Sequence, residues 1–88
     1  LPQQFAQMQA KQTLQIVAQK YYDCLPDYLI SEHQDDGASP DFHAQVKIGK
    51  LTLGEGKASS KKRAEQHAAW QAILVLRQTE TYPELHNQ

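Results

Sequence analysis

The chain contains little cysteine and no long apolar run. Cys24 is the single cysteine among 88 residues, so no disulfide can form within the chain, which is compatible with a reducing compartment. Although 40% of the residues are apolar, no run approaches the ~18 consecutive apolar residues of a membrane-spanning helix, and no signal peptide is apparent. We therefore expect a soluble protein of the cell interior, in the cytoplasm.

The sequence also lacks the side-chain groupings that metal binding and catalysis require. The histidines are scattered and have no cysteine partner at a ligand spacing typical of zinc. They are His33, His43, His67 and His86. Asp35 and Asp36 lie in a turn-forming stretch, and no nucleophile stands beside a base in any recognisable pattern. We expect no metal, no cofactor and no catalytic residue in this chain.

An overall excess of positive charge is missing too, since the formal net charge is −1. The distribution is uneven, however, because residues 57–77 carry five basic side chains against one acidic side chain, a local charge of +4, and the remainder therefore carries −5. The basic residues are Lys57, Lys61, Lys62, Arg63 and Arg77. One concentrated basic segment is compatible with an anionic partner despite the net value.

Two segments have the apolar spacing of amphipathic helices. Residues 12–22 carry apolar side chains at three- and four-residue steps, which places them on one helical face. This face consists of Leu14, Val17, Ala18 and Tyr21. A second helix is expected from a cap at Ser59 or Ser60 to Arg77, with small alanines that let it lie close to a sheet. Its buried stripe is expected to be Ala64, Ala68, Ala72 and Val75.

The residues between these helices predict strands. Pro26 ends the first helix because proline lacks an amide hydrogen and clashes with the preceding turn. From Phe42 onward, apolar and polar residues alternate as in a strand with one buried face. Gly54 and Gly56 are expected to end the third strand. The expected strands are residues 28–33, 42–48 and 51–55, joined by a loop over 34–41 and a turn at Gly49 and Lys50.

These elements predict an α+β fold of the order α-β-β-β-α, with two helices packed on one face of a three-stranded antiparallel sheet. The domain is expected to span residues 12–77. Residues 1–11 are a glutamine-rich leader, helical or unstructured, and residues 78–88 are expected to be a flexible tail because they contain Pro83 and no periodicity. Since the chain begins with Leu1, we expect it to be part of a larger protein.

The start of the second helix is unusual because it is basic. Lysines in a first helical turn are unfavourable there, since that end already carries a partial positive charge and unpaired amide hydrogens. A bound phosphate relieves both, which makes Lys57, Lys61 and Lys62 candidate phosphate ligands. The alternative is a solvated basic turn without a ligand.

The stretch LGEGKASSKKRAEQHAAWQAI, residues 53–73, resembles the C-terminal half of the double-stranded-RNA-binding domain family, especially the version attached to bacterial ribonuclease III. The SKKRAEQHAA portion is the most specific match. Upstream, TLQIVAQK resembles the family's first helix, LPDYLISE its first strand, and DFHAQVKIGKLTLGEG its hairpin. The resemblance implies a module that reads RNA duplex shape over about 16 base pairs through two minor grooves and the phosphates between them.

The resemblance also assigns roles to individual residues. Lys61 and Lys62 match the family's lysine pair, Lys57 lies just before them, and Ser60 matches the small polar residue at the helix start. On the first helix, the face that the family turns toward RNA carries three glutamines, whose amides can donate to and accept from ribose hydroxyls and base edges. These are Gln12, Gln15 and Gln19.

At two places the sequence departs from the family pattern. Ile16 stands where a glutamate commonly contacts a ribose hydroxyl. In the first loop, Asp35, Asp36, Gly37 and Ala38 replace a Gly-Pro-x-His pattern. Aspartates near a phosphate-lined groove weaken binding by repulsion. We therefore expect modest affinity, with Ser39 as a candidate for the second minor-groove contact.

The outer face of the second helix is a candidate protein contact. Helical spacing places His67, Trp70, Ile73 and Leu74 opposite the alanine stripe, so that Trp70 would face solvent. Such a patch usually contacts something, and the candidates are the leader with Phe5 and Met8, another domain or a second copy of the chain. A lone exposed tryptophan is the remaining explanation. Of these residues, His67, Trp70 and Leu74 are the expected contacts.

Three hypotheses for function follow. The first is sequence-tolerant binding of double-stranded RNA, which the lysine cluster favours. The second is an interaction or dimerisation module that kept the fold and lost RNA affinity, suggested by Ile16, the acidic loop and Trp70. The third, compatible with the first, is an RNA-docking arm of an RNA-processing enzyme whose active site lies elsewhere in the larger protein.

Overall fold

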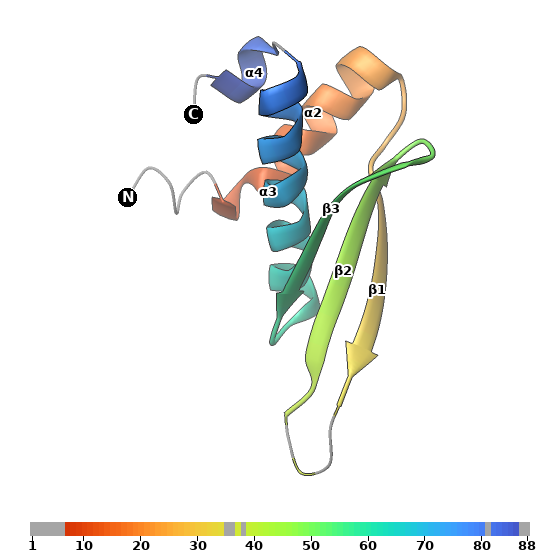
Figure 1. Ribbon diagram of the computed structural model, residues 1–88, viewed down its shortest axis with the longest axis vertical. Coiled ribbons are helices and arrows are strands. Elements are labelled where there is room, and N and C mark those ends of the chain that lie inside the picture. The colour runs from red at the N-terminus through yellow and green to blue at the C-terminus, as the bar shows by residue number, and fades with distance from the viewer. Residues whose placement is uncertain (1–6, 35–36, 38, 81, 87–88) are drawn as a thin grey trace.

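A computed structural model describes residues 7–34, 37, 39–80 and 82–86. The elements follow one another as one helix, three strands, a long helix and a short helix (Figure 1). They are α2 (Ala10–Tyr22), β1 (Asp27–His33), β2 (Asp41–Ile48), β3 (Leu51–Ala58), α3 (Lys61–Thr79) and α4 (Pro83–His86). The structure confirms the expected α+β order, and none of the described helices is long and apolar enough to cross a membrane.

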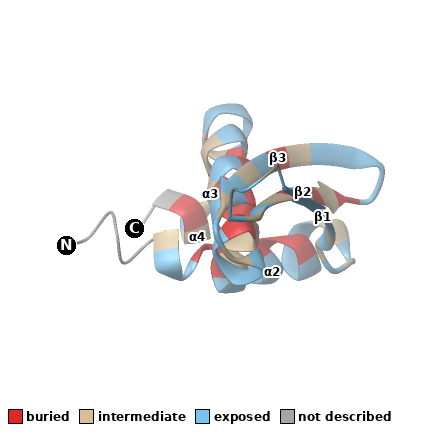
Figure 2. Ribbon diagram, turned by 90° about the horizontal axis from the view of Figure 1, so that it is seen from below, coloured by how far each residue is buried: buried red, intermediate tan, exposed pale blue. Residues whose placement is uncertain are grey.

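The strands form one antiparallel sheet in the order β1-β2-β3. The alternation predicted for β2 is present from Ala44 onward, because Ala44, Val46 and Ile48 are buried, whereas Gln45 is exposed and Lys47 is half-buried. The register shifts between Val46 and Lys47, where β3 accommodates one extra residue. Helices α2 and α3 cover one face of this sheet, and the buried residues gather where the layers meet (Figure 2).

The alanine stripe lets α3 pack directly on the backbone of β3. Ala64, Ala68 and Ala72 are fully buried. Opposite them, a Cβ atom on Gly54 would lie 2.1 Å from the Ala68 carbonyl oxygen, and one on Gly56 would lie 2.5 Å from that of Ala64. The prediction that these glycines end the strand is wrong, because β3 continues to Ala58 and uses them for close approach to the helix.

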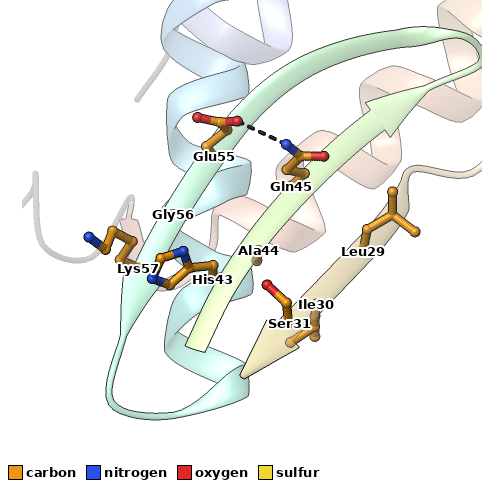
Figure 3. Close-up of a pocket in the computed structure, with 9 residues that line it drawn as sticks. All are labelled: Leu29, Ile30, Ser31, His43, Ala44, Gln45, Glu55, Gly56 and Lys57. Atoms are coloured by element: carbon orange, nitrogen blue, oxygen red, sulfur yellow. Dashed lines mark hydrogen bonds between the residues drawn. The ribbon is translucent and has the colours of Figure 1, made fainter. Parts of the chain in front are cut away.

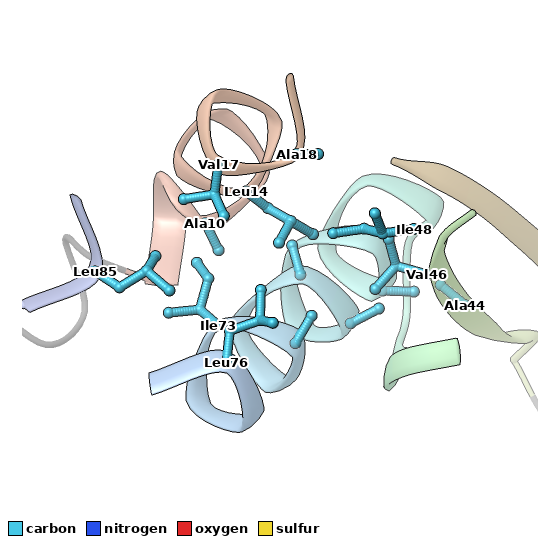
Figure 4. Close-up of a cluster of buried hydrophobic side chains, with 14 residues drawn as sticks. Ala10, Leu14, Val17, Ala18, Ala44, Val46, Ile48, Ile73, Leu76 and Leu85 are labelled. Carbon is cyan, nitrogen blue, oxygen red and sulfur yellow. The ribbon is translucent and has the colours of Figure 1, made fainter. Parts of the chain in front are cut away.

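The buried arc of α3 is wider than the stripe predicted from sequence. Ile73, expected on the outer face, is fully buried, and Leu76 takes the place predicted for Val75, which is 39% exposed. The reason is that α3 packs against the sheet on one side and against α2 on another, so two faces are covered. Leu14 and Val17 of α2 meet Ile73 in this second layer (Figure 4).

The C-terminal residues form part of the core, in contrast to the flexible tail expected there. Leu85 of α4 is completely buried beside α2 and α3 (Figure 4). The Tyr82 ring stacks on Tyr21 with centroids 4.2 Å apart, and its hydroxyl shares a 2.8 Å hydrogen bond with Tyr22. Tyr22 packs against the core, whereas Tyr21, predicted to be buried, is 37% exposed because it covers Tyr82 instead.

Glu84 completes this C-terminal clasp, which we define as Tyr82, Glu84 and Leu85 against the end of α2. Its carboxylate accepts hydrogen bonds from the Lys20 ammonium at 2.7 Å and the Tyr21 hydroxyl at 2.8 Å. The hydrogen bond from Lys20, followed by the other hydrogen bonds, lowers the pKa of Glu84 to about 2. The same hydrogen bond raises the pKa of Lys20.

Candidate nucleic-acid interface

Ser60 begins α3 as a conventional cap. Its backbone is extended, and its hydroxyl oxygen accepts a 3.2 Å hydrogen bond from the Arg63 amide. The first turn of α3 contains no acidic residue to balance the positive end of the helix dipole. The partial positive charge at this helix start is therefore available to an anion.

The three predicted lysine ligands surround this helix start. Lys57 is exposed near the end of β3, and Lys61 and Lys62 are exposed in the first turn of α3. Lys61 Nζ lies 5.9 Å from the centroid of the Phe42 ring. Across the described part of the chain, the ion pairs are formed by Lys11 and Lys20, and none involves these three lysines. Among the described residues, no carboxylate therefore lies within ion-pair distance of these three ammonium groups.

The glutamine face of α2 is solvent-exposed, as predicted. Gln12, Gln15 and Gln19 are all exposed, and Ile16 between them is 54% exposed. Gln12 and Gln15 line a shallow groove together with Gln66 of α3. The groove shows that the structure brings this face of α2 to the N-terminal half of α3, where the lysines lie.

The loop between β1 and β2 is described only in part. Ser39 is exposed, and Gly37 has a positive φ of 74°, as a turn glycine can adopt without strain. The acidic positions Asp35 and Asp36, and Ala38, lie outside the described residues, as does Phe5 of the leader. Met8, also placed in the leader, is 71% exposed.

The outer face of α3 is less exposed than its spacing suggested. Trp70 is half-buried and packs against the core, and Leu74 is half-buried as well. His67 is exposed, and its Nδ1 shares a 3.0 Å hydrogen bond with the Lys57 carbonyl. Gln7 lines a groove with His67 and Trp70, so the chain preceding α2 approaches this face.

A stacked histidine pair lies on the sheet face opposite the helices. The rings of His33 and His43 have centroids 3.9 Å apart, and His33 Nε2 shares a 3.1 Å hydrogen bond with Ser31. Burial, then the charges of His33 and Lys57, lower the pKa of His43. Figure 3 shows this face, where Glu55 accepts a hydrogen bond from Gln45. Among the residues described, no three histidine, cysteine or acidic side chains gather as metal ligands would.

Sequence reasoning missed a set of contacts between the two long helices. The Lys11 amide donates to Gln66 Oε1 at 3.1 Å, and the Lys11 ammonium lies 2.5 Å from a carboxylate oxygen of Glu65. The ammonium also lies 5.0 Å from the centroid of the Tyr28 ring, and burial raises the pKa of this tyrosine. The partners are 54 and 55 positions apart, so no local pattern signals the contact.

A three-stranded sheet under two helices, with a capped basic helix start beside a glutamine-lined helix, defines a module suited to duplex nucleic acid. The chain belongs to the double-stranded RNA binding motif family, whose model matches residues 10–76. The resemblance seen in the sequence is thereby confirmed.

Similar proteins support the same family. The chain is 44% identical over 63 residues to "Ribonuclease 3 2" of Synechocystis sp., covering 70% of this chain and 26% of that protein. It is 38% identical over 63 residues to "Ribonuclease 3" of Chlamydia muridarum, covering 72% of this chain and 27% of that protein. The chain thus spans about a quarter of the length of these relatives.

One solved structure shares the fold. A chain described as "Structure of Dicer from Pichia stipitis" superposes with a TM-score of 0.63 at 28% identity. The match covers 78% of this chain and 33% of that one. In both kinds of comparison, the matched region is one part of a longer chain.

Proposed function

We propose that the chain binds double-stranded RNA by shape and largely independently of sequence. Phosphates contact Lys57, Lys61 and Lys62 at the start of α3, where Ser60 is the cap. Minor-groove hydroxyls contact the glutamine face of α2, formed by Gln12, Gln15 and Gln19. The observation that carries this proposal is a cluster of exposed lysines at a helix N-terminus, beside an exposed amide-rich helix face, with no ion-pair partner among the residues that the structure describes.

The second minor-groove contact is assigned to the loop between β1 and β2, with Ser39 as the polar group. Its affinity contribution is small because the loop carries two aspartates. The exposed side chain of Ile16 offers no hydrogen bond to a ribose hydroxyl. Modest affinity with a steep salt dependence follows.

In the larger protein, the chain acts as an RNA-docking module, and the chemistry belongs to another part. The relatives named ribonuclease 3 match this chain over about a quarter of their own length. Their names support a role for this chain in RNA processing. We also propose that the protein acts in the cytoplasm.

The test is titration of a labelled RNA duplex of about 20 base pairs, read by fluorescence anisotropy at low and physiological salt, with a DNA duplex for comparison. Lys61→Ala/Lys62→Ala is expected to lower RNA affinity about tenfold or more, because two phosphate contacts are lost. The matched control is Lys47→Ala/Lys50→Ala, which removes the same charge around the β2–β3 turn, away from the start of α3 (Figure 1).

Equal losses in the two double variants would show that only net charge matters and would contradict the assigned site. If the wild-type chain binds no RNA even at low salt, the proposed function is wrong and the second candidate function is favoured. That candidate is a protein contact or homodimer through the outer face of α3, formed by His67, Trp70 and Leu74. The groove lined by Gln7, His67 and Trp70 supports it.

A further inference from the structure

The start of α2 is capped by a side chain from α3. Gln9, the residue before α2, provides no capping hydrogen bond from its side chain. The first amides of a helix need outside acceptors, and the Lys11 amide finds one in Gln66 Oε1 at 3.1 Å. A residue 55 positions away thus does what a local cap usually does.

An ion pair next to this hydrogen bond joins the same two helices, α2 and α3. Glu65 and Lys11 lie 2.5 Å apart, and their side chains are only 20% and 34% exposed. Lys11 also lies over the Tyr28 ring of β1. Although basic and close to the glutamine face, Lys11 is therefore neutralised within the protein, and its charge is not offered to a phosphate.

These contacts stand between the two proposed RNA-binding surfaces. Gln12 directly follows Lys11, and the groove lined by Gln12 and Gln15 is also lined by Gln66 of α3. On α3, Glu65 and Gln66 each lie four residues after one of the proposed phosphate ligands, Lys61 and Lys62, on the same part of the helix surface.

An RNA duplex fixes the separation between its minor groove and the neighbouring phosphates. A protein whose two contact surfaces are already held at that separation loses less free energy on binding. We propose that Glu65 and Gln66 are positioning residues that hold the glutamine face of α2 and the lysine site of α3 in the arrangement required by an RNA duplex. This inference rests on the proposed function and adds the residues that make binding selective for RNA.

The test relies on Glu65→Gln, for which an effect of charge and an effect of geometry would change RNA affinity in opposite directions. Removing a carboxylate beside the lysine site raises the positive charge and by itself strengthens binding to any polyanion. Loosening the arrangement weakens binding to RNA. We expect Glu65→Gln to bind a 20-base-pair RNA duplex about fivefold more weakly and a DNA duplex of equal length as well as or better than wild type.

Two further variants separate positioning from charge. Gln66→Ala changes no charge and is expected to lower RNA affinity with an unchanged slope of log affinity against log salt. The charge-reversed pair Lys11→Glu/Glu65→Lys keeps both the net charge of wild type and the bridge, so it is expected to bind RNA as tightly as wild type does. The matched control is Glu55→Gln, which removes an exposed carboxylate on the uncovered sheet face (Figure 3).

All affinities are measured below the melting temperature of each variant, verified by circular dichroism, so that a loss of binding does not reflect unfolding. If Glu65→Gln and Glu55→Gln both bind RNA as tightly as wild type or more tightly, Glu65 acts only as a charge and the inference is overturned. A wild-type chain that does not prefer RNA to DNA overturns the proposed function itself, which is a separate and recognisable result.

Discussion

At the residue scale, Gly54 and Gly56 determine how close α3 comes to the sheet. Both pair with inward-facing residues of β2, at positions where any side chain would point into α3. The helix contributes alanines there, so backbone meets backbone with no larger group between. The glycines of β3 and the alanines of α3 therefore depend on each other, because a larger side chain on either element would push the two elements apart.

We predict that Gly54→Ala strongly destabilises the domain. The new methyl group would lie 2.1 Å from the Ala68 carbonyl oxygen and 2.7 Å from the Ala72 amide, both backbone atoms that move only with the helix. Overpacking of this kind costs about 3 kcal/mol or more of unfolding free energy. Urea denaturation measures the loss. Glu55→Ala, at the exposed position between the two glycines, is expected to change stability little, and an equal effect there would contradict the explanation.

At the element scale, α4 is only four residues long and depends on its contacts with α2. An isolated helix of this length is not stable in water. Three contacts supply the stability that such a short helix lacks on its own. They are the burial of Leu85 in the core, the stacking of the Tyr82 ring on Tyr21, and the ion pair of Glu84 with Lys20. The clasp thereby extends the folded unit beyond residue 76, where the family match ends.

The clasp predicts a pH dependence of stability at acidic pH. The pKa of Glu84 is lowered from 4.5 to about 2 in the folded state, so its contribution is complete above pH 4.5 and is lost as pH falls toward 2. The melting temperatures of wild type and Glu84→Gln should therefore differ at pH 7 and converge near pH 2. Because the group is exposed, added salt should reduce the difference.

Glu80→Gln serves as the control for this measurement, because it removes an exposed carboxylate at the end of α3. Its effect is expected to be smaller than that of Glu84→Gln at pH 7. A difference for Glu84→Gln that stayed constant from pH 7 to pH 2 would show that the ionised carboxylate does not stabilise the clasp.

At the scale of the whole molecule, the proposed binding surface draws on elements from both halves of the chain. The glutamine face belongs to α2, Ser39 to the loop between β1 and β2, and the lysines to β3 and α3. Each surface alone is small, so the duplex must be long enough to reach all of them. Binding should therefore depend on duplex length more than on sequence.

We predict that affinity rises with RNA duplex length up to about 16 base pairs and then increases only through the number of available positions. Competition titrations with duplexes of about 8, 12, 16 and 20 base pairs of unrelated sequence measure this dependence. Shuffled sequences of equal length serve as controls. A strong preference for one sequence over its shuffled counterpart would contradict recognition by shape.

The sequence predicted those features of the molecule that depend on residues close together in the chain. The alternation in β2 and the alanine stripe of α3 are local patterns, and both were found in the structure. The exposure of Gln12, Gln15, Lys61 and the other proposed ligands was likewise predictable from helical spacing and charge. Their contact with RNA remains a proposal.

The parts that sequence did not predict depend on distant neighbours. Ile73 was assigned to the outer face of α3 because a single helix gives no sign of a second packing partner. Gly54 and Gly56 resemble strand ends unless the helix above them is known. The clasp and the contact of Lys11 with Gln66 each join residues more than 50 positions apart, which periodicity cannot show.

Because α2 is tied to α3 at its start and to α4 at its end, this first described helix lacks these contacts until residues 65–85 are present. During synthesis, the apolar face of α2 is therefore made before the residues of α3 and α4 that cover it. The closing contacts span more than 60 positions, and the chain entropy lost in forming such long loops makes this a late step of folding. A chain interrupted before Tyr82 would expose the surface that Leu85 covers and offer it to chaperones or to aggregation.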